Sequence, residues 1–312
     1  MLRDASGGWL RGLDRYRRLA IITTVGICVL VVAGGVVRLT GSGLGCDDWP
    51  SCNAERFVDV SSGHTAIEQA NRLLSGVIGL PTLLLAVAAF RQQPRRLGLR
   101  WPAVGVFLSV FANGVVGGIA VRADLHPALV QSHFLLAMVS ITFGMIAIRR
   151  SAETQPDAAR FEPRTRQLVT IISVLTAAAL ATGTVVTGTG PHAGEEDVRR
   201  FGFEISHVAR IHSVTVIFAL VVAVALVVQL RSDKPAQRRL GGTLSAWIFV
   251  GLLQGGVGYT QYFNGVPEVL VGVHIALATA LWVISMQLFV FACAIEIVKP
   301  ALKVEPQPLA RV

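Results

Sequence analysis

The chain has 312 residues, of which 53% are hydrophobic and only 15% are charged. Soluble domains carry about 25% charged residues, so this composition excludes an ordinary soluble protein as well as a disordered or collagen-like chain. The net charge is +9, but the Lys and Arg residues fall in short gaps between apolar runs and do not gather on one folded surface. We therefore expect a multi-pass membrane protein that binds no nucleic acid.

Eight apolar runs are long enough to cross a membrane, which takes about 20 mostly apolar residues in a helix. The first follows basic residues, as a secretory signal does, but its length and the lack of a clear cleavage site favour a retained span. The seventh is the weakest because it is short and rich in glycine. In chain order the runs cover residues 19–39, 67–90, 101–121, 127–148, 168–187, 208–230, 243–259 and 269–298.

The charged residues between these runs predict how the chain is oriented. Of the 28 Lys and Arg residues, 21 lie in the two tails and the even-numbered loops, and 7 lie in the odd-numbered loops and the adjoining helix ends. Loops rich in Lys and Arg remain on the cytoplasmic side. We therefore expect both termini in the cytoplasm and a protein of the cell (plasma) membrane.

Distinctive residues recur at a constant spacing and indicate an internal repeat. Asn71 precedes His212 by 141 residues, and His133 precedes His274 by the same number. Since each half then holds an even number of spans, the two halves should share one orientation about an axis along the membrane normal. Two glycine pairs keep this spacing: Gly114 with Gly255, and Gly117 with Gly258.

The predicted fold class is therefore an all-α membrane protein with eight transmembrane helices. These helices should form two tandem, pseudo-symmetric four-helix bundles. We expect residues 1–150 to make the N-terminal bundle and residues 151–312 to make the C-terminal bundle.

Three histidines lie inside predicted spans, where ionisable side chains are costly and usually functional. His133, His212 and His274 each lie a few residues into a helix that runs inward from the outer face, so they should share one depth near that face. His212 and His274, on the sixth and eighth spans, can hold a planar macrocycle through its iron, which points to a haem. The alternative is a pair of buried histidines bonded to the backbone or to each other.

A polar group also opens the second span. Glu68 and Arg72 are four residues apart and can pair on one helix face, and Asn71 is three residues from Glu68. These side chains should look toward the site into which His133 projects. A buried carboxylate beside a cofactor is a candidate proton carrier. Alternatively, Glu68 interacts with the helix dipole and Arg72 extends to the membrane interface.

Cys46 and Cys52 flank a five-residue segment in the first outer loop. A disulfide in a loop outside the cytoplasm can form and persist. Two roles are open for this pair. The pattern favours a structural crosslink over a redox-active pair that passes electrons.

Taken together, these residues resemble the haem A synthase family, membrane enzymes of cytochrome oxidase assembly. The resemblance covers nearly the whole chain and includes residues 34–38, residues 40–43 and the Trp49-Pro50 pair between the cysteines. Members of that family oxidise the C8 methyl group of haem O to a formyl group. Successive hydroxylations give a geminal diol, which loses water to form the aldehyde.

The resemblance implies a haem b cofactor whose iron has His212 and His274 as axial ligands. It also implies that haem O binds in the N-terminal bundle, at His133, with Glu68 near the reacting methyl group. The implied partners are membrane lipid, haem O synthase or oxidase assembly factors, and an electron donor or acceptor.

One position departs from the family pattern. The family usually has Glu-x-x-His-Arg in the second span, whereas this chain has Asn71 between Glu68 and Arg72. The departure implies that the substrate haem has one protein axial ligand, His133. Asn71 then ligates weakly or holds a water molecule, or His64 moves in as the second ligand.

Two other functions share some of these features. An electron-transfer cytochrome of the b type, linked to quinone, would use the His212 and His274 pair but has no need for Glu68. A membrane transporter built on the same duplication usually has broken helices and a site at the bilayer midplane. The polar groups of this chain are expected near the outer face instead.

Overall fold

The computed structural model describes residues 12–92, 95–152, 161–195 and 197–293, and all regular elements in these ranges are helices. Each helix is long and apolar enough to cross a membrane, and the protein is a multi-pass membrane protein. The helices are α1 (Leu13–Leu39), α2 (Gly63–Phe90), α3 (Leu97–Arg122), α4 (Pro127–Arg150), α5 (Pro163–Thr189), α6 (Ile205–Ser232), α7 (Lys234–Phe263) and α8 (Glu268–Ala292).

Seven of the predicted spans lie wholly inside one of these helices. The eighth also lies in a helix, α8, but its last residues, 294–298, fall outside the described part of the chain. The weakest predicted span corresponds to α7, which has 30 residues. Its first turns are polar, and they become helical because Asp233 caps the helix by accepting a 3.0 Å hydrogen bond from the Ala236 N–H.

Local signals also fix the start of α2, the helix that carries Glu68 and Asn71. Ser62 Oγ accepts a hydrogen bond from the Thr65 N–H at 3.2 Å, and Thr65 Oγ1 accepts one from the Ser62 N–H at 2.9 Å. This capping box satisfies N–H groups that the helix itself cannot bond. The register of the polar side chains in the next turns is thereby set.

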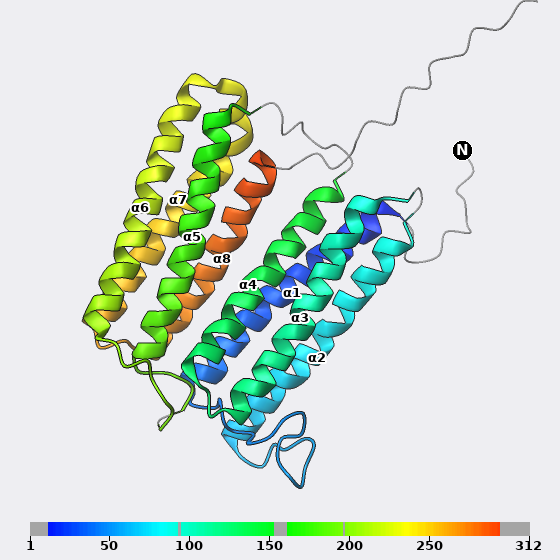
Figure 1. Ribbon diagram of the computed structural model, residues 1–312, viewed down its shortest axis with the longest axis vertical. Helices are drawn as coiled ribbons and strands as arrows, with labels where there is room; N and C mark the ends of the chain where they lie inside the picture. Colours follow the sequence, from blue (N-terminus) through cyan, green and yellow to red (C-terminus); the bar gives the residue numbers. More distant parts are fainter. Residues whose placement is uncertain (1–11, 93–94, 153–160, 196, 294–312) are drawn as a thin grey trace, which may run out of the picture.

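The helices lie in two groups of four, α1–α4 and α5–α8 (Figure 1). In the first group, α1 and α3 each pack against α2 and α4, so α2 and α4 face each other diagonally. In the second group, α5 and α7 each pack against α6 and α8, so α6 and α8 face each other in the same way. The four helices that carry Asn71 and the intramembrane histidines are therefore the two diagonal pairs.

The two groups share a packed interface. Helix α8 lies against α1 and α4, and α4 lies against α5. The Trp282 indole N–H on α8 donates a 2.9 Å hydrogen bond to the Met138 carbonyl on α4. Trp282 and Met286 belong to the same buried apolar cluster as residues of α1–α4. The groups are thus continuous through the protein interior.

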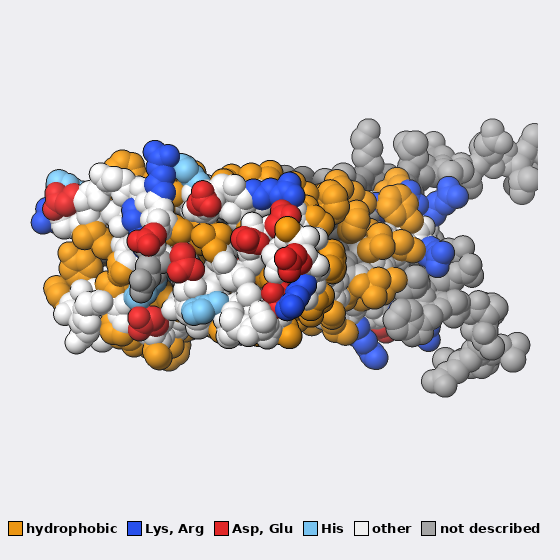
Figure 2. Space-filling view, turned by 90° about the horizontal axis from the view of Figure 1, so that it is seen from below, with side chains coloured by type: hydrophobic (Ala, Val, Ile, Leu, Met, Phe, Trp, Pro, Cys, Tyr) orange, Lys and Arg blue, Asp and Glu red, His pale blue; other side chains and the backbone are white. Residues whose placement is uncertain are grey.

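The connections α1–α2, α3–α4, α5–α6 and α7–α8 lie at one end of the molecule, which we call the loop end (bottom of Figure 1). Leu13 and Ala292, where the helical part of the chain starts and stops, lie at the other end. Acidic, basic and histidine side chains gather at the loop end (Figure 2). Many apolar side chains on the helix flanks are exposed, as contact with lipid requires.

The four polar positions inside the membrane lie close to the loop end. Asn71, His133, His212 and His274 each come six to eight residues after the first residue of an even-numbered helix. Each of these helices starts at the loop end, so the side chains lie about 9–12 Å along the helix axis from it. Their common depth agrees with the sequence prediction.

Candidate functional site

His212 and His274 face each other from α6 and α8. Their imidazole centroids are 6.4 Å apart, and the ring planes are inclined at 68°. His212 Nδ1 lies 3.2 Å from Thr182 Oγ1 on α5. His274 Nδ1 is buried and has no hydrogen-bond partner among the described residues. Buried polar atoms are rarely left without a partner, so His212 and His274 are candidates for holding a group from outside the chain.

Glycines on neighbouring helices leave room for these two imidazole rings. A Cβ atom at Gly183 would lie 3.1 Å from His212 Cε1, and one at Gly258 would lie 3.2 Å from His274 Cε1. Both distances are shorter than ordinary van der Waals contact. The two rings therefore lie directly against helix backbone, and any larger residue at either glycine would displace them.

His133 on α4 is arranged similarly against α3. Its Nδ1 lies 3.0 Å from the Asn113 carbonyl oxygen, and a Cβ at Gly117 would lie 2.9 Å from its Cε1. A histidine that donates its Nδ1 proton to a carbonyl keeps an unprotonated Nε2, which is the arrangement found in metal-bound histidines. His133 is thus prepared to act as a ligand.

Asn71 lies on α2, the helix diagonally opposite His133. Its side-chain oxygen Oδ1 is buried and has no hydrogen-bond partner among the described residues. Its backbone carbonyl accepts a 2.8 Å hydrogen bond from Ser75 Oγ. Like His274, Asn71 presents an unpaired polar atom within the helix group.

Glu68 is held by the first outer loop and by its own helix. It is only 4% exposed. Its Oε2 accepts a 2.7 Å hydrogen bond from the Cys46 N–H, and its Oε1 accepts two from Arg72, at 3.0 Å from Nε and 2.6 Å from Nη2. The predicted pairing of Glu68 with Arg72 is therefore present, and the structure directs both side chains toward the loop.

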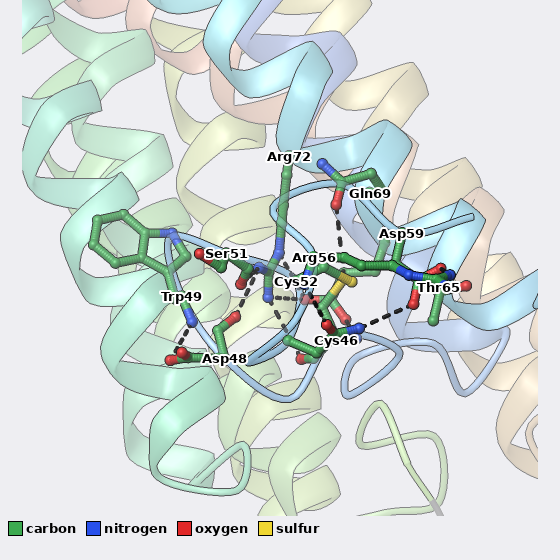
Figure 3. Close-up of a disulfide and its surroundings, with 12 residues drawn as sticks. Cys46, Asp48, Trp49, Ser51, Cys52, Arg56, Asp59, Thr65, Gln69 and Arg72 are labelled. Atoms are coloured by element: carbon green, nitrogen blue, oxygen red, sulfur yellow. Dashed lines mark hydrogen bonds and ion pairs between the residues drawn. A yellow bond between two sulfur atoms is a disulfide. The ribbon is translucent and has the colours of Figure 1, made fainter. Parts of the chain in front are cut away.

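Cys46 and Cys52 form a disulfide, as expected from the sequence, and both are buried. We call residues 46–52 the disulfide loop. Arg72 holds the backbone of this loop by donating hydrogen bonds to the carbonyl oxygens of Asp48 at 2.8 Å and Ser51 at 3.0 Å (Figure 3). The buried guanidinium therefore fixes the loop over the start of α2.

The disulfide loop is also fixed to α3. The Trp49 ring lies against Gly118, where a Cβ would come within 2.5 Å of Trp49 Cδ2. Arg122 donates to Asp48 Oδ1 at 3.1 Å and to the Trp49 carbonyl at 2.5 Å. The Trp49 N–H and then Arg122 lower the pKa of the Asp48 carboxyl below its ordinary value. The loop thus bridges α2 and α3 at the loop end.

Sequence reasoning missed Arg38, which joins the two helix groups at the loop end. From the last turn of α1, it donates to the Thr187 carbonyl at 2.8 Å and to the His192 carbonyl. The Gly43 N–H adds a 3.0 Å hydrogen bond to the Gly194 carbonyl. An arginine inside an apolar run was an available signal, because charges in spans are costly.

The donor atoms of the site favour a macrocycle over a bare metal ion. In the described residues, no three His, Cys, Asp or Glu side chains are grouped as a metal ion would need. Two facing imidazoles supply only two ligands, whereas zinc takes three or four from the protein. A haem provides four nitrogens of its own, so the protein needs to provide only axial ligands.

Comparison with known proteins gives a consistent picture. The haem A synthases of Bacillus mycoides (strain KBAB4) and Bacillus cereus (strain AH187) are each 32% identical to this chain over 123 residues. The match spans 39% of this chain and 40% of the length of each relative. The profile of the cytochrome oxidase assembly protein family, COX15-CtaA, matches residues 17–286. Because this match covers most of the sequence, the chain belongs to the cytochrome oxidase assembly protein family.

Proposed function

We propose that this protein is a haem A synthase, which oxidises the C8 methyl group of haem O to a formyl group. The observation that carries the proposal is the facing pair His212 and His274 in a chain of this family. Relatives named haem A synthase support the choice of reaction.

The spacing of the two rings fits a bound haem b. A metal–imidazole nitrogen bond is about 2 Å, so nitrogens on opposite sides of one iron lie about 4 Å apart, and the ring centroids about 6 Å apart. The observed separation is 6.4 Å. His212 and His274 are the axial ligands in this proposal, and Thr182 orients His212 through Nδ1. Haem b, when bound, supplies one-electron redox chemistry.

We also propose that the two helix groups are related by duplication, with residues 1–150 binding substrate and residues 151–312 binding haem b. Two kinds of contact support this relationship. His133 lies against Gly117 and His274 lies against Gly258, each 16 residues earlier. A residue 20 positions earlier also contacts each histidine, although through different atoms: His133 Nδ1 donates to the Asn113 carbonyl, whereas the Gln254 side-chain amide donates to the backbone carbonyl of His274.

In the substrate half, His133 is the ligand for the haem O iron, and Asn71 and Arg72 complete the site. Glu68 is the proton acceptor as each hydroxylation removes hydrogen from the methyl group. Its Oε2 accepts a hydrogen bond from the Cys46 N–H, and its Oε1 accepts one from Arg72. The disulfide loop keeps this carboxylate in one position.

The proposed orientation places both termini in the cytoplasm and the haem sites toward the outer face of the plasma membrane. The excess of Lys and Arg on one side and the disulfide at the loop end support it. Its partners in this setting are lipid, haem O synthase or oxidase assembly factors, and an electron donor or acceptor.

The test is to purify the protein from cells with and without haem O, record reduced-minus-oxidised spectra, and identify the extracted haems by mass. Haem b together with haem O or haem A is the expected result. Haem b alone, with haem O supplied, contradicts the synthase and indicates an electron-transfer cytochrome. Absence of haem contradicts both.

A further inference from the structure

We infer that the substrate haem is held by His133 alone, and that its opposite side is an open position for a small ligand beside the amide of Asn71. The inference rests on the proposed function and deepens it. It concerns which side of the bound haem is accessible and which class of molecule binds there. Diatomic ligands such as O2, CO or cyanide fit this position.

The first support is the place of Asn71 in the fold. Helices α2 and α4 face each other diagonally, as α6 and α8 do. His133 and His274 lie at matching positions on α4 and α8, each six residues after the start of its helix. Asn71, eight residues into α2, occupies the position that His212 holds seven residues into α6. One half therefore presents two imidazoles and the other presents one imidazole and one amide.

The second support is the state of the Asn71 side chain. Its Oδ1 is buried and has no partner in the described structure, which is costly unless a bound group completes it. An amide both donates and accepts hydrogen bonds. It can therefore bond a diatomic molecule or a water on the iron, whereas it is a much weaker iron ligand than imidazole.

No nearby histidine replaces the missing ligand. His64 is the one histidine of α2, but it precedes Asn71 by seven residues, which is about 10 Å along a helix. Its side chain is exposed, and its Nδ1 lies 3.0 Å from Ser42 Oγ. It belongs to the surface of the loop end rather than to the interior position that Asn71 occupies.

These two arrangements give the haems different properties. An iron with two imidazole ligands has both axial positions filled and exchanges electrons without binding diatomic molecules. An iron with one imidazole has a free axial position, and the polarity of the surrounding pocket decides what binds there. A haem in the second half would therefore have both axial positions filled, and a haem in the first half would have one axial position open.

The experiment measures CO binding by the reduced protein, loaded with haem O and compared with protein containing haem b only. We expect one CO per haem O and none per haem b. Asn71→His should abolish CO binding and give a low-spin spectrum. The reciprocal variant His212→Asn should open the haem b to CO. Gly256→Ala, at a position with open space around it, is the neutral control.

If Asn71→His does not accumulate, Asn71→Ala provides the test. It should retain CO binding and shift the CO stretching frequency, because the amide contact is lost. Two outcomes overturn this inference while leaving the proposed function intact. In one, the wild-type protein loaded with haem O binds no CO. In the other, the Asn71→His protein still binds CO. Protein that takes up no haem O overturns the proposed function.

Discussion

The Cys46 N–H donates a 2.7 Å hydrogen bond to Glu68 Oε2, so one end of the disulfide is joined directly to the candidate proton acceptor. The sequence offered two separate roles for these residues, a crosslinked loop and a carboxylate near a cofactor. The structure makes them one unit. A change in the conformation of the disulfide loop is therefore transmitted to the Glu68 carboxylate through a single hydrogen bond.

Two substitutions at Glu68 distinguish proton transfer from loop positioning. Glu68→Gln keeps an oxygen that can accept the Cys46 N–H but cannot take up a proton. Removal of a general base costs about 10²–10⁴-fold in rate, so haem A formation should fall by that amount in both Glu68→Gln and Glu68→Ala. The haem b spectrum should stay normal. Full activity in Glu68→Gln would restrict Glu68 to a positioning role.

Arg72 should control the order of the disulfide loop. Arg72→Ala leaves Glu68 without its buried partner and frees the carbonyl groups of Asp48 and Ser51. Breaking a buried ion pair costs about 3–5 kcal/mol. We expect a lower thermal midpoint and faster proteolysis between residues 46 and 52. Arg56→Ala, which removes an exposed ion pair with Asp59, is the control and should change neither.

The disulfide should stabilise the loop without affecting the second half of the protein. Replacing Cys46 and Cys52 by serine should cost about 2 kcal/mol, a typical value for a short loop. Thiol labelling and proteolysis report the loop, and the reduced spectrum reports haem b, which should be unchanged. Cys293→Ser, at a free cysteine near α5, is the matched control. Loss of haem b in the double variant would show that the loop supports both halves.

Substitutions of the three histidines should distinguish the haem b site from the haem O site. His212→Ala and His274→Ala should each lose the low-spin haem b signal, because each removes one axial ligand. His133→Ala should keep that signal and lose haem O from the extracted pigments. Optical spectra and mass analysis of the extract measure both. A normal low-spin spectrum in both His212→Ala and His274→Ala would refute the ligand assignment.

The glycines beside the histidine rings should not tolerate a methyl group. Gly258→Ala places a Cβ 3.2 Å from His274 Cε1, and Gly117→Ala places one 2.9 Å from His133 Cε1. Each variant should lower the haem content of its own half only. Gly256→Ala and Gly114→Ala have open space around the new methyl group and should bind haem normally.

Much of the fold was predictable because its signals are local. Each span is a continuous apolar run in the sequence. The length of α7 was not predictable from hydropathy, because its first turns are polar and depend on the Asp233 cap. The pairing of diagonal helices needed the structure.

The site was only partly predictable. Histidines inside apolar runs are conspicuous, so the sequence alone singles out His133, His212 and His274 as candidates. The contact of Trp49 with Gly118 and the hydrogen bonds of Arg38 to Thr187 at the end of α5 and to His192 join residues far apart in the sequence. No local pattern encodes such contacts.

The hydrogen bond from Trp282 to Met138 lies in the apolar interface between the two helix groups. An apolar interface between two domains opposes their relative motion, and this one contains the buried side chains of Trp282 and Met286. A substrate haem bound at His133 on α4 and a haem b bound at His274 on α8 would therefore keep a constant separation throughout turnover. Electrons passing between them would tunnel across a fixed gap, and no hinge motion would limit the rate.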